Sequence, residues 1–270
     1  MSVKLGLLYS RIRKDEKLLL QELRDRGHTV EKIDVRKQQF GLEDSTVDAE
    51  SLDLLLDRCV ATSRSKYATE FFEAYDVPVV NPPAVADVCS DKVKTSLALE
   101  NAGVPTPETT VAFTSDAAMD AIEDFGYPVV LKPVVGSWGR LMARIEDEHA
   151  AEAILEHKET LGHYEHKVFY IQEFVEKPDR DIRVLALDGQ PVAGMVRSAD
   201  HWTTNAHRGA DTDGVEVDEA VADIVEAASD AVGGGLLGVD LMETEDGYTV
   251  HEVNHTVEYK ALNDAVDVDV

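Results

Sequence analysis

The chain carries GVDLM at residues 238–242 and HEVN at residues 251–254, and these two segments are its most informative. Each is predicted to be a short strand, because apolar residues flank the polar ones at strand spacing. Asp240 lies between apolar neighbours, where burying an unpaired carboxylate would be costly. A hard cation would remove that cost, which makes Asp240 a candidate metal ligand.

Glu252 and Asn254 are separated by one residue in the second of these strands. Because side chains alternate along a strand, both are predicted to point to one face, while His251 and Val253 point to the other. Carboxylate and amide oxygens suit Mg²⁺, which usually bridges protein carboxylates to substrate phosphates. The pattern predicts a Mg²⁺ site at Asp240, Glu252 and Asn254; a pair of solvated strand carboxylates is the alternative.

A glycine-containing loop, GSWGR at residues 136–140, lies upstream of this site. It follows the apolar strand PVVLKP at residues 128–133, which contains Lys132 near its end. Glycines let backbone N–H groups approach phosphate oxygens, and a lysine at the strand end supplies a compact positive charge. Together they predict a phosphate-binding loop, although such a loop by itself is more often a hairpin turn.

The segment YIQEFV at residues 170–175 is an apolar strand interrupted by Gln172 and Glu173. Adenine recognition commonly uses backbone N–H and C=O groups of such a segment between apolar walls. Glu173 is placed to accept a hydrogen bond from an exocyclic amine or a ribose hydroxyl. An edge strand with outward polar residues is the alternative.

Several cationic and amide side chains follow this strand. Asp181 and Arg183 are predicted to share one face of the next strand, where an arginine can bind phosphate through two hydrogen bonds. Arg197 ends a further strand, and Asn205 and Arg208 lie in the irregular loop predicted after it. These groups are suited to stabilise an anionic transition state.

The N-terminal part, residues 1–86, alternates apolar strands with a helix that starts near Lys14, which predicts a small parallel-sheet domain. Its first turn lacks a G-x-G-x-x-G pattern, which argues against dinucleotide binding there. Strands are predicted here at residues 3–8, 29–35, 52–57 and 77–81. Farther along, helices are predicted at residues 91–102, 114–125 and 218–232, and an irregular loop at residues 199–215.

The chain has 270 residues and a formal net charge of −27. Nucleic acids need a basic surface that displaces their counterions, so this balance argues against nucleic acid as a partner. Acidic residues occur in every segment, which suggests a halophilic protein adapted to high internal salt. Cys59 and Cys89 lack zinc-site spacing, and no segment resembles a signal peptide or membrane span. A cytoplasmic protein without membrane contact is expected.

Taken together, these segments resemble the ATP-grasp superfamily, in particular the branch that contains LysX and ArgX, close to the RimK-type glutamate ligases. The resemblance rests on LYSRIR at residues 8–13, DKVKT at 91–95, KPVVGSWGR at 132–140, QEFVEKP at 172–178, DIRV at 181–184, TTNAHRG at 203–209 and EVNHTVEYK at 252–260. It implies an α/β fold, α+β in the ATP-grasp part, with three domains. These are an N-terminal domain at residues 1–86, a central domain with the glycine-rich loop at 87–167, and a C-terminal domain with the adenine strand and Mg²⁺ site at 168–270.

The resemblance also implies roles for single residues. The nucleotide would be held by Lys92, Lys132, Gly136, Ser137, Trp138, Gly139, Gln172, Glu173, Phe174, Val175 and Asp181. Two Mg²⁺ ions would be bound by Asp240, Glu252 and Asn254. Catalytic roles fall to Arg183, Arg197, Asn205 and Arg208, and substrate contacts to Arg197, Asn254, Thr256 and Glu258.

The implied reaction starts with ATP, whose γ-phosphoryl group is transferred to a carboxylate so that its oxygen becomes a leaving group. An amine then displaces phosphate. In the LysX/ArgX branch the carboxylate belongs to the C-terminal glutamate of LysW, a small acidic amino-group carrier protein. The amine is that of glutamate or 2-aminoadipate, and these differ by one methylene, so both stay open.

A basic cluster at Arg11, Arg13 and Lys14 is then the expected docking site for the acidic carrier, although a solvated helix start is the alternative. A homo-oligomer, dimer or tetramer, is expected. Two other functions compete with the main one: a RimK-like glutamate ligase acting on a ribosomal-protein or coenzyme tail, and a non-catalytic ATP-binding regulator.

Overall fold

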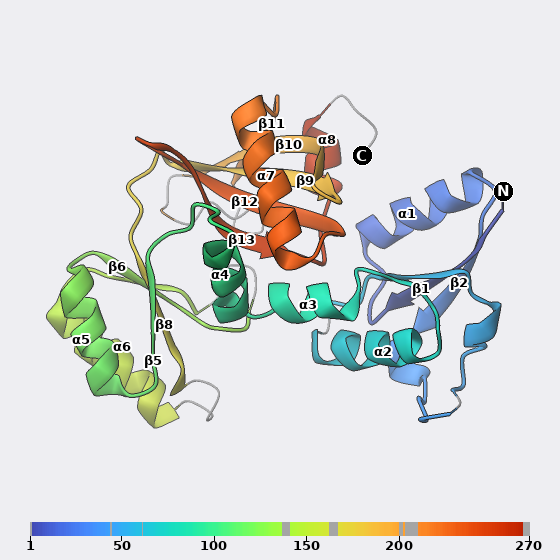
Figure 1. Ribbon diagram of the computed structural model, residues 1–270, viewed down its shortest axis with the longest axis horizontal. Coiled ribbons are helices and arrows are strands. Elements are labelled where there is room, and N and C mark those ends of the chain that lie inside the picture. The colour runs from blue at the N-terminus through green and yellow to red at the C-terminus, as the bar shows by residue number, and fades with distance from the viewer. Residues whose placement is uncertain are drawn as a thin grey trace.

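The computed structural model describes residues 2–43, 45–60, 62–136, 141–161, 167–199, 202 and 210–266. Within these ranges the strands form three sheets, which occupy separate parts of the molecule (Figure 1). The N-terminal sheet lies at the right of Figure 1, the central sheet at the left and the C-terminal sheet at the top. Five residues with predicted roles lie outside the described ranges: Ser137, Trp138, Gly139, Asn205 and Arg208.

The N-terminal sheet is parallel, with the order β2-β1-β3-β4, and so confirms the predicted parallel sheet. Its strands are β1 (Lys4–Tyr9), β2 (Thr29–Asp34), β3 (Leu54–Asp57) and β4 (Val79–Val80), and its helices are α1 (Lys14–Asp25) and α2 (Thr62–Ala74). Short 3-10 turns, η1 (Val35–Lys37) and η2 (Ala49–Ser51), complete it. A Cβ at Gly6 would lie within 2.9 Å of the Leu55, Ile33 and Leu52 side chains, so glycine lets the core close around β1.

Two helices join this sheet to the rest of the chain: α3 (Pro83–Cys89) and α4 (Lys92–Asn101). β4 ends before the two prolines, and Pro83 starts α3, because proline suits the first helical position, where its missing N–H is not needed. Asp91 caps α4 by accepting hydrogen bonds from two backbone N–H groups. Val85 of α3 and Leu99 of α4 are buried in the core beneath the C-terminal sheet.

The central sheet is antiparallel, with the order β5-β8-β6-β7, and α5 (Ser115–Phe125) and α6 (Glu148–Leu161) pack together beside it. Its strands are β5 (Thr109–Ala112), β6 (Val129–Lys132), β7 (Ala143–Ile145) and β8 (Phe169–Glu173). The sequence assigned β8 to the C-terminal domain, which is wrong, because β8 is hydrogen-bonded between β5 and β6. We therefore propose that the central domain extends to Glu173.

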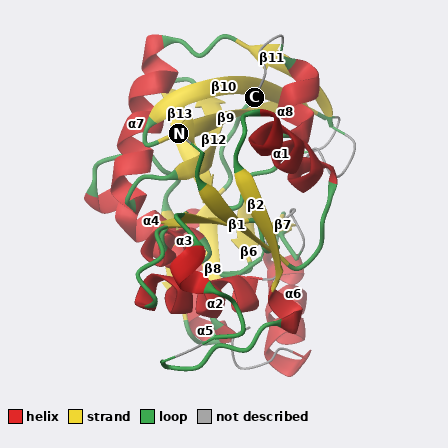
Figure 2. Cartoon of the chain, turned by 90° about the vertical axis from the view of Figure 1, so that its right-hand side faces the viewer, coloured by secondary structure: helices red, strands yellow, loops and turns green. Residues whose placement is uncertain are grey.

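The C-terminal sheet is antiparallel, with the order β11-β10-β9-β12-β13. Its strands are β9 (Arg180–Leu187), β10 (Gln190–Ser198), β11 (Asp211–Val215), β12 (Leu236–Thr244) and β13 (Gly247–Asn254), and its helices are α7 (Glu219–Val232) and α8 (Lys260–Ala265). The predicted irregular loop at 199–215 is wrong at its end, where β11 pairs with β10. In Figure 2, α8 lies beside α1, and the Tyr259 backbone N–H, just before α8, donates to Asp15 of α1.

β13 contains a bulge that changes which way its side chains point. Asp240 is opposite Glu252, but Leu241 is opposite Val250, so His251 is an extra residue in the strand. Val250 and Val253 consequently both face the core, while His251 and Glu252 both line the pocket described below. The prediction that His251 and Glu252 point to opposite faces is therefore wrong.

Candidate active site

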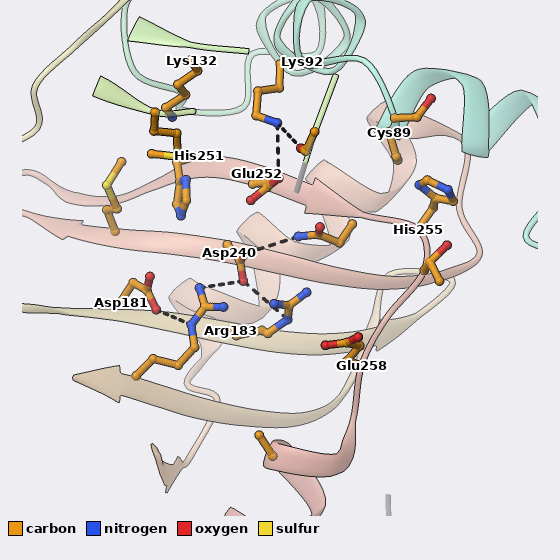
Figure 3. A pocket seen from close by; sticks show the side chains of 18 of the residues that line it. Cys89, Lys92, Lys132, Asp181, Arg183, Asp240, His251, Glu252, His255 and Glu258 are labelled. Carbon is orange, nitrogen blue, oxygen red and sulfur yellow. Dashed lines mark hydrogen bonds and ion pairs between the residues drawn. The ribbon is translucent and has the colours of Figure 1, made fainter. Parts of the chain in front are cut away.

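A cavity of about 570 Å³ lies where the three sheets approach one another. Lys132 and Gln172 reach it from the central sheet, Asp240 and Glu252 from the C-terminal sheet, and Arg13 from the start of α1. Figure 3 shows the lysines on one side of this pocket and the arginine–carboxylate cluster on the other. No helix within the described ranges has both the length and the apolar character needed to cross a membrane.

Lys132 provides a buried cation at one end of the pocket. It is 6% exposed, and its Nζ donates to Gln172 Oε1. Gln172 Nε2 in turn donates to Thr109 Oγ1 at 2.9 Å and to the Tyr170 hydroxyl at 3.0 Å, which fixes the amide. Burial lowers the pKa of Lys132 to about 8, an effect that nearby Glu252 opposes. An anionic ligand would stabilise the charged form of this lysine.

Lys92, in the first turn of α4, supplies a second cation. Its Nζ donates to the Gly136 carbonyl oxygen at 2.9 Å and lies 3.6 Å from Glu252 Oε1. This contact connects α4 to the first residue of the predicted phosphate loop and to a predicted metal ligand (Figure 3). Lys92, Lys132 and Gly136 therefore lie together, as the sequence pattern requires.

The predicted adenine segment, residues 172–175, also lines the pocket. The Arg144 guanidinium lies over the Phe174 ring at 4.1 Å and covers one apolar wall. Glu173 Oε1 accepts a hydrogen bond from the Glu108 backbone N–H at 2.8 Å. Glu173 is thus engaged with the chain entering β5, and its predicted contact with a nucleotide stays a prediction.

A buried arginine, a partly buried arginine and two buried aspartates form the centre of the pocket. Arg197 Nε lies 2.6 Å from Asp181 Oδ1, and Arg197 Nη2 lies 3.1 Å from Asp240 Oδ1. Arg183 Nε lies 3.6 Å from the same Asp240 oxygen. Burial alone would raise the pKa of Asp240, but Arg183 and Arg197 lower it, so the carboxylate stays ionised. Predicted positions 181, 183, 197 and 240 are thereby brought together in one network.

The oxygen atoms near Asp240 fit a magnesium ion. Asp240 and Glu252 are directly opposite each other on β12 and β13, and Asn254 Nδ2 lies 3.3 Å from Asp240 Oδ2. Among the described residues, the buried Asp240 Oδ1 forms ion pairs with Arg183 and Arg197 but has no well-directed hydrogen bond. In the described part of the chain no group of three His, Cys, Asp or Glu side chains forms a metal cluster. The donor set here is two carboxylates and one amide, which suits Mg²⁺.

At the opposite end of the pocket, Arg13 and Glu258 form an ion pair, and Arg13 Nη2 also lies 2.7 Å from Glu16 Oε1. Arg13 is therefore engaged inside the molecule. Arg11 and Lys14 are exposed, and Lys14 Nζ lies 3.6 Å from Asp264 Oδ1. The predicted basic cluster is thus divided between a buried contact and two surface cations.

Two consecutive parts of the sequence match two sequence families. Residues 5–88 match the LysX preATP-grasp domain, and residues 89–270 match the RimK-like ATP-grasp domain. The chain belongs to the RimK-like ATP-grasp family. The predicted superfamily, its fold class and the enzyme class, an ATP-dependent carboxylate–amine ligase, are confirmed with it.

Named relatives cover nearly the whole ATP-grasp chain. The alpha-aminoadipate–LysW ligase LysX of Sulfurisphaera tokodaii is 36% identical, over 95% of this chain and 91% of that protein. The glutamate–LysW ligase ArgX of the same organism is 30% identical, over 98% of this chain and 94% of that protein. The crystal structure of a RimK domain ATP-grasp protein from Sphaerobacter thermophilus superimposes with a TM-score of 0.78 at 26% identity, and covers 97% of this chain and 94% of that one.

Sequence reasoning missed several residues of the ATP-grasp pocket. His251 was predicted to point away from Glu252, because the pattern of apolar and polar residues in β13 does not reveal the bulge at this position. Asp15 looked like an ordinary acidic residue in the first turn of a helix, and Cys59 is far in sequence from the predicted site residues. Cys89 and His255 lie close in sequence to Lys92 and Asn254, but no pattern marked them. The missed residues that line the pocket include Asp15, Cys59, Val60, Cys89, Ser90, Met142, Lys177, Met195, Trp202, Met242, His251, His255 and Lys260.

Proposed function

We propose that the protein uses ATP to activate the C-terminal glutamate carboxylate of LysW and joins it to the α-amino group of glutamate or 2-aminoadipate. Such a reaction belongs to arginine or lysine biosynthesis. One observation carries the proposal: a single pocket joins a cationic end at Lys92 and Lys132 to an acceptor end at Thr256 and Glu258. The relatives named above, LysX and ArgX, are LysW ligases that match nearly the full chain, which supports this acceptor.

The residues of the pocket would have different roles in the reaction. Lys92 and Lys132 would bind the nucleotide phosphates, and residues 172–175 would hold the adenine. Arg183 and Arg197 would stabilise the negative charge that develops as the phosphoryl group moves to the carboxylate. Asp181 and Asp240 hold Arg197 in place by ion pairs, so its guanidinium does not need to reorganise during the reaction.

Asp240, Glu252 and Asn254 would hold Mg²⁺, with two ions predicted. When bound, Mg²⁺ would neutralise phosphate charge and position the transferring group. The carboxylates also serve the free protein, because Glu252 lies near Lys92 and Asp240 near Arg183 and Arg197. The negative charges of these carboxylates keep the cations in place before the nucleotide enters.

The decisive experiment incubates the protein with ATP, Mg²⁺ and LysW and adds glutamate in one reaction and 2-aminoadipate in another. We expect the mass of LysW to increase by one residue of the accepted amino acid, and the size of the increase identifies it. Reactions without ATP or without an amino acid are the controls. An unchanged LysW mass in every reaction would refute the proposal.

A second candidate acceptor has support from one other relative. The tetrahydromethanopterin:alpha-L-glutamate ligase of Methanococcus maripaludis is 34% identical, but it matches only 74% of this chain and 68% of its own. LysX matches more of both chains, which favours LysW. Glutamate incorporation into a coenzyme or ribosomal-protein tail, with none into LysW, would select this alternative.

Carrier docking is proposed at Arg11 and Lys14, since Arg13 is already paired with Glu16 and Glu258. Reversing the charge with Arg11→Glu is expected to raise KM for LysW several-fold, because an acidic partner loses its electrostatic attraction. KM for ATP should not change. Arg24→Glu is the control, because Arg24 is exposed in the last turn of α1, at the end of the helix away from Arg11. An equal rise in both KM values would contradict a docking role.

A further inference from the structure

The segment of residues 255–260, called here the acceptor segment, connects β13 to α8 at one end of the pocket. His255, Thr256, Glu258 and Lys260 from this segment line the cavity. Val257, between them, is 1% exposed and packs into a small core with Leu185, Met195 and Leu262. The segment thus has one residue fixed in the core and the others placed around the predicted substrates.

The far end of the acceptor segment is held by Asp15, which belongs to α1 in the N-terminal domain. Asp15 Oδ1 accepts hydrogen bonds from the backbone N–H groups of Tyr259 at 2.9 Å and Lys260 at 3.0 Å. The Tyr259 hydroxyl donates to the Asp15 backbone oxygen at 2.7 Å. Asp15 is only 5% exposed, so the acceptor side of these partly buried bonds is shielded from water.

This contact replaces a helix cap that the local sequence does not supply. Tyr259 occupies the N-cap position of α8, and its side chain makes no capping hydrogen bond. The first N–H groups of a helix need acceptors from elsewhere. Asp15 provides the acceptor from a different domain, so the start of α8 depends on where α1 lies.

The near end of the acceptor segment is also held by the N-terminal domain. Asn81, directly after β4, donates from Nδ2 to the His255 carbonyl oxygen at 2.6 Å. Only Thr256, Val257 and Glu258 lie between this bond and the Asp15 bonds. The backbone that carries the predicted substrate residues is therefore fixed at both ends by side chains of another domain.

We propose that Asp15 is a positioning residue for the amine-transfer half of the reaction. By fixing Tyr259 and Lys260, Asp15 sets how far Thr256 and Glu258 lie from the activated carboxylate. Asp15 would act through the acceptor segment and not through contact with reacting atoms. The inference rests on the proposed ligase function and adds to it the residue that determines whether the amine or water reaches the acyl group.

The hydrogen-bonding geometry requires an oxygen acceptor at Asp15 Oδ1 and does not require a negative charge. Asparagine keeps that oxygen, whereas alanine removes it. Asp15→Asn should therefore preserve the position of the acceptor segment, and Asp15→Ala should release it. Asp25→Ala is the matched control, because it removes an exposed carboxylate from the last turn of the same helix.

The experiment measures ADP and ligated carrier in the same reaction, for the unaltered protein and the three variants. We expect Asp15→Ala to form ligated product about ten- to hundred-fold more slowly, since small misplacements at a site are costly in rate. Its KM for ATP should be unchanged. ADP should exceed ligated product, because water attacks the acyl-phosphate, restores the carboxylate and releases phosphate. Asp15→Asn and Asp25→Ala should keep ADP and product equal.

Different outcomes would overturn the proposal. If Asp15→Asn were as impaired as Asp15→Ala, with a raised KM for the amine, Asp15 would bind the ammonium group directly. If Asp15→Ala raised KM for ATP, Asp15 would only stabilise the fold in general. If the variant kept ADP and product equal, Asp15 would have no positioning role. Should Asp15→Ala fail to fold, Tyr259→Phe is the second variant, because it removes only the hydroxyl bond to Asp15. It should also raise the ratio of ADP to ligated product. An unchanged ratio would refute the proposal. Failure of the proposed function itself would appear separately, as no product from the unaltered protein.

Discussion

Lys132 is buried in the free protein although lysine is among the residues least often buried. Within the part of the chain that the structure describes, its Nζ donates to Gln172 alone, which leaves two donor positions for a ligand in the pocket. The lowered pKa measures the cost of this arrangement, because the charged form is less stable inside the protein than in water. The stability that the protein gives up at Lys132 fits the proposed role of this residue, which is to hold a cation in place for phosphate.

Lys132→Met is expected to stabilise the free protein while weakening ATP binding. The pKa of Lys132 is about 8 in the folded protein against 10.5 in its reference state, so the cost of the charge is fully present below pH 8. It disappears as pH rises from 8 to 10.5. Urea unfolding should thus show a gain of up to about 3 kcal/mol at pH 7 that shrinks at higher pH.

The matched control is Lys158→Met, which removes a half-buried lysine that lies over Phe169 in the same domain, outside the pocket. It should change ATP affinity little, as measured by calorimetry. If Lys132→Met bound ATP as tightly as the unaltered protein, the assignment of Lys132 to the phosphates would be wrong.

At the scale of elements, strand alternation predicted β12 and the shared face of Asp181 and Arg183 in β9. That Arg197 and Asp240 join them in one site was implied only by the family resemblance. The same rule failed in β13, where one extra residue, His251, reverses the pattern. Bulges are decided by pairing with a neighbouring strand, and a single sequence does not display that pairing. α8 was likewise missed, since its cap comes from Asp15 in a distant part of the chain.

Asn81, directly after β4, contacts Leu236 at the start of β12, and the sequence did not predict this contact, which is called here the joint between β4 and β12. Asn81 donates to the Leu236 carbonyl oxygen at 2.8 Å and accepts from the Leu236 N–H at 2.6 Å, across 155 residues. Polar residues after a strand normally indicate a turn, and this one does end β4. Its second role depends on a partner that only the folded chain brings close.

Gly235→Ala tests this joint. Gly235 has φ +99, and a Cβ there would collide with the Asn81 side chain. We expect a loss of about 1–3 kcal/mol from backbone strain and a further loss from displaced Asn81. Gly27→Ala is the control, because Gly27 has φ +82 but nothing within 4 Å of its Cβ position. Urea unfolding compares them, and equal losses would show that Asn81 does not matter to the joint.

At the scale of the whole molecule, the net charge of −27 sets the conditions under which the fold is stable. Most of the acidic side chains lie on the surface, where they repel one another and salt screens the repulsion. Buried carboxylates such as Glu16, Asp181 and Asp240 are instead paired with arginines. Screening should therefore act mainly on the surface and leave the pocket intact.

The melting temperature is expected to rise as KCl increases from about 0.1 M to about 2 M. Each kcal/mol of relieved repulsion should add about 2–4 °C for a chain of this size. The control repeats the series near pH 4.5, the sequence pI, where the net charge is small and the effect of KCl should shrink. A melting temperature independent of KCl at neutral pH would contradict the halophilic hypothesis.

The contact between α1 and the acceptor segment also has a consequence for folding kinetics. Asp15 and Tyr259 are 244 residues apart, so nearly the whole chain must be ordered before they meet. Contacts of such high sequence separation form late, because closing a long loop costs chain entropy before the native contacts that offset this cost have formed. During refolding from urea, ATP binding should therefore return before carrier ligation. A stopped-flow comparison of the two recoveries would measure the delay.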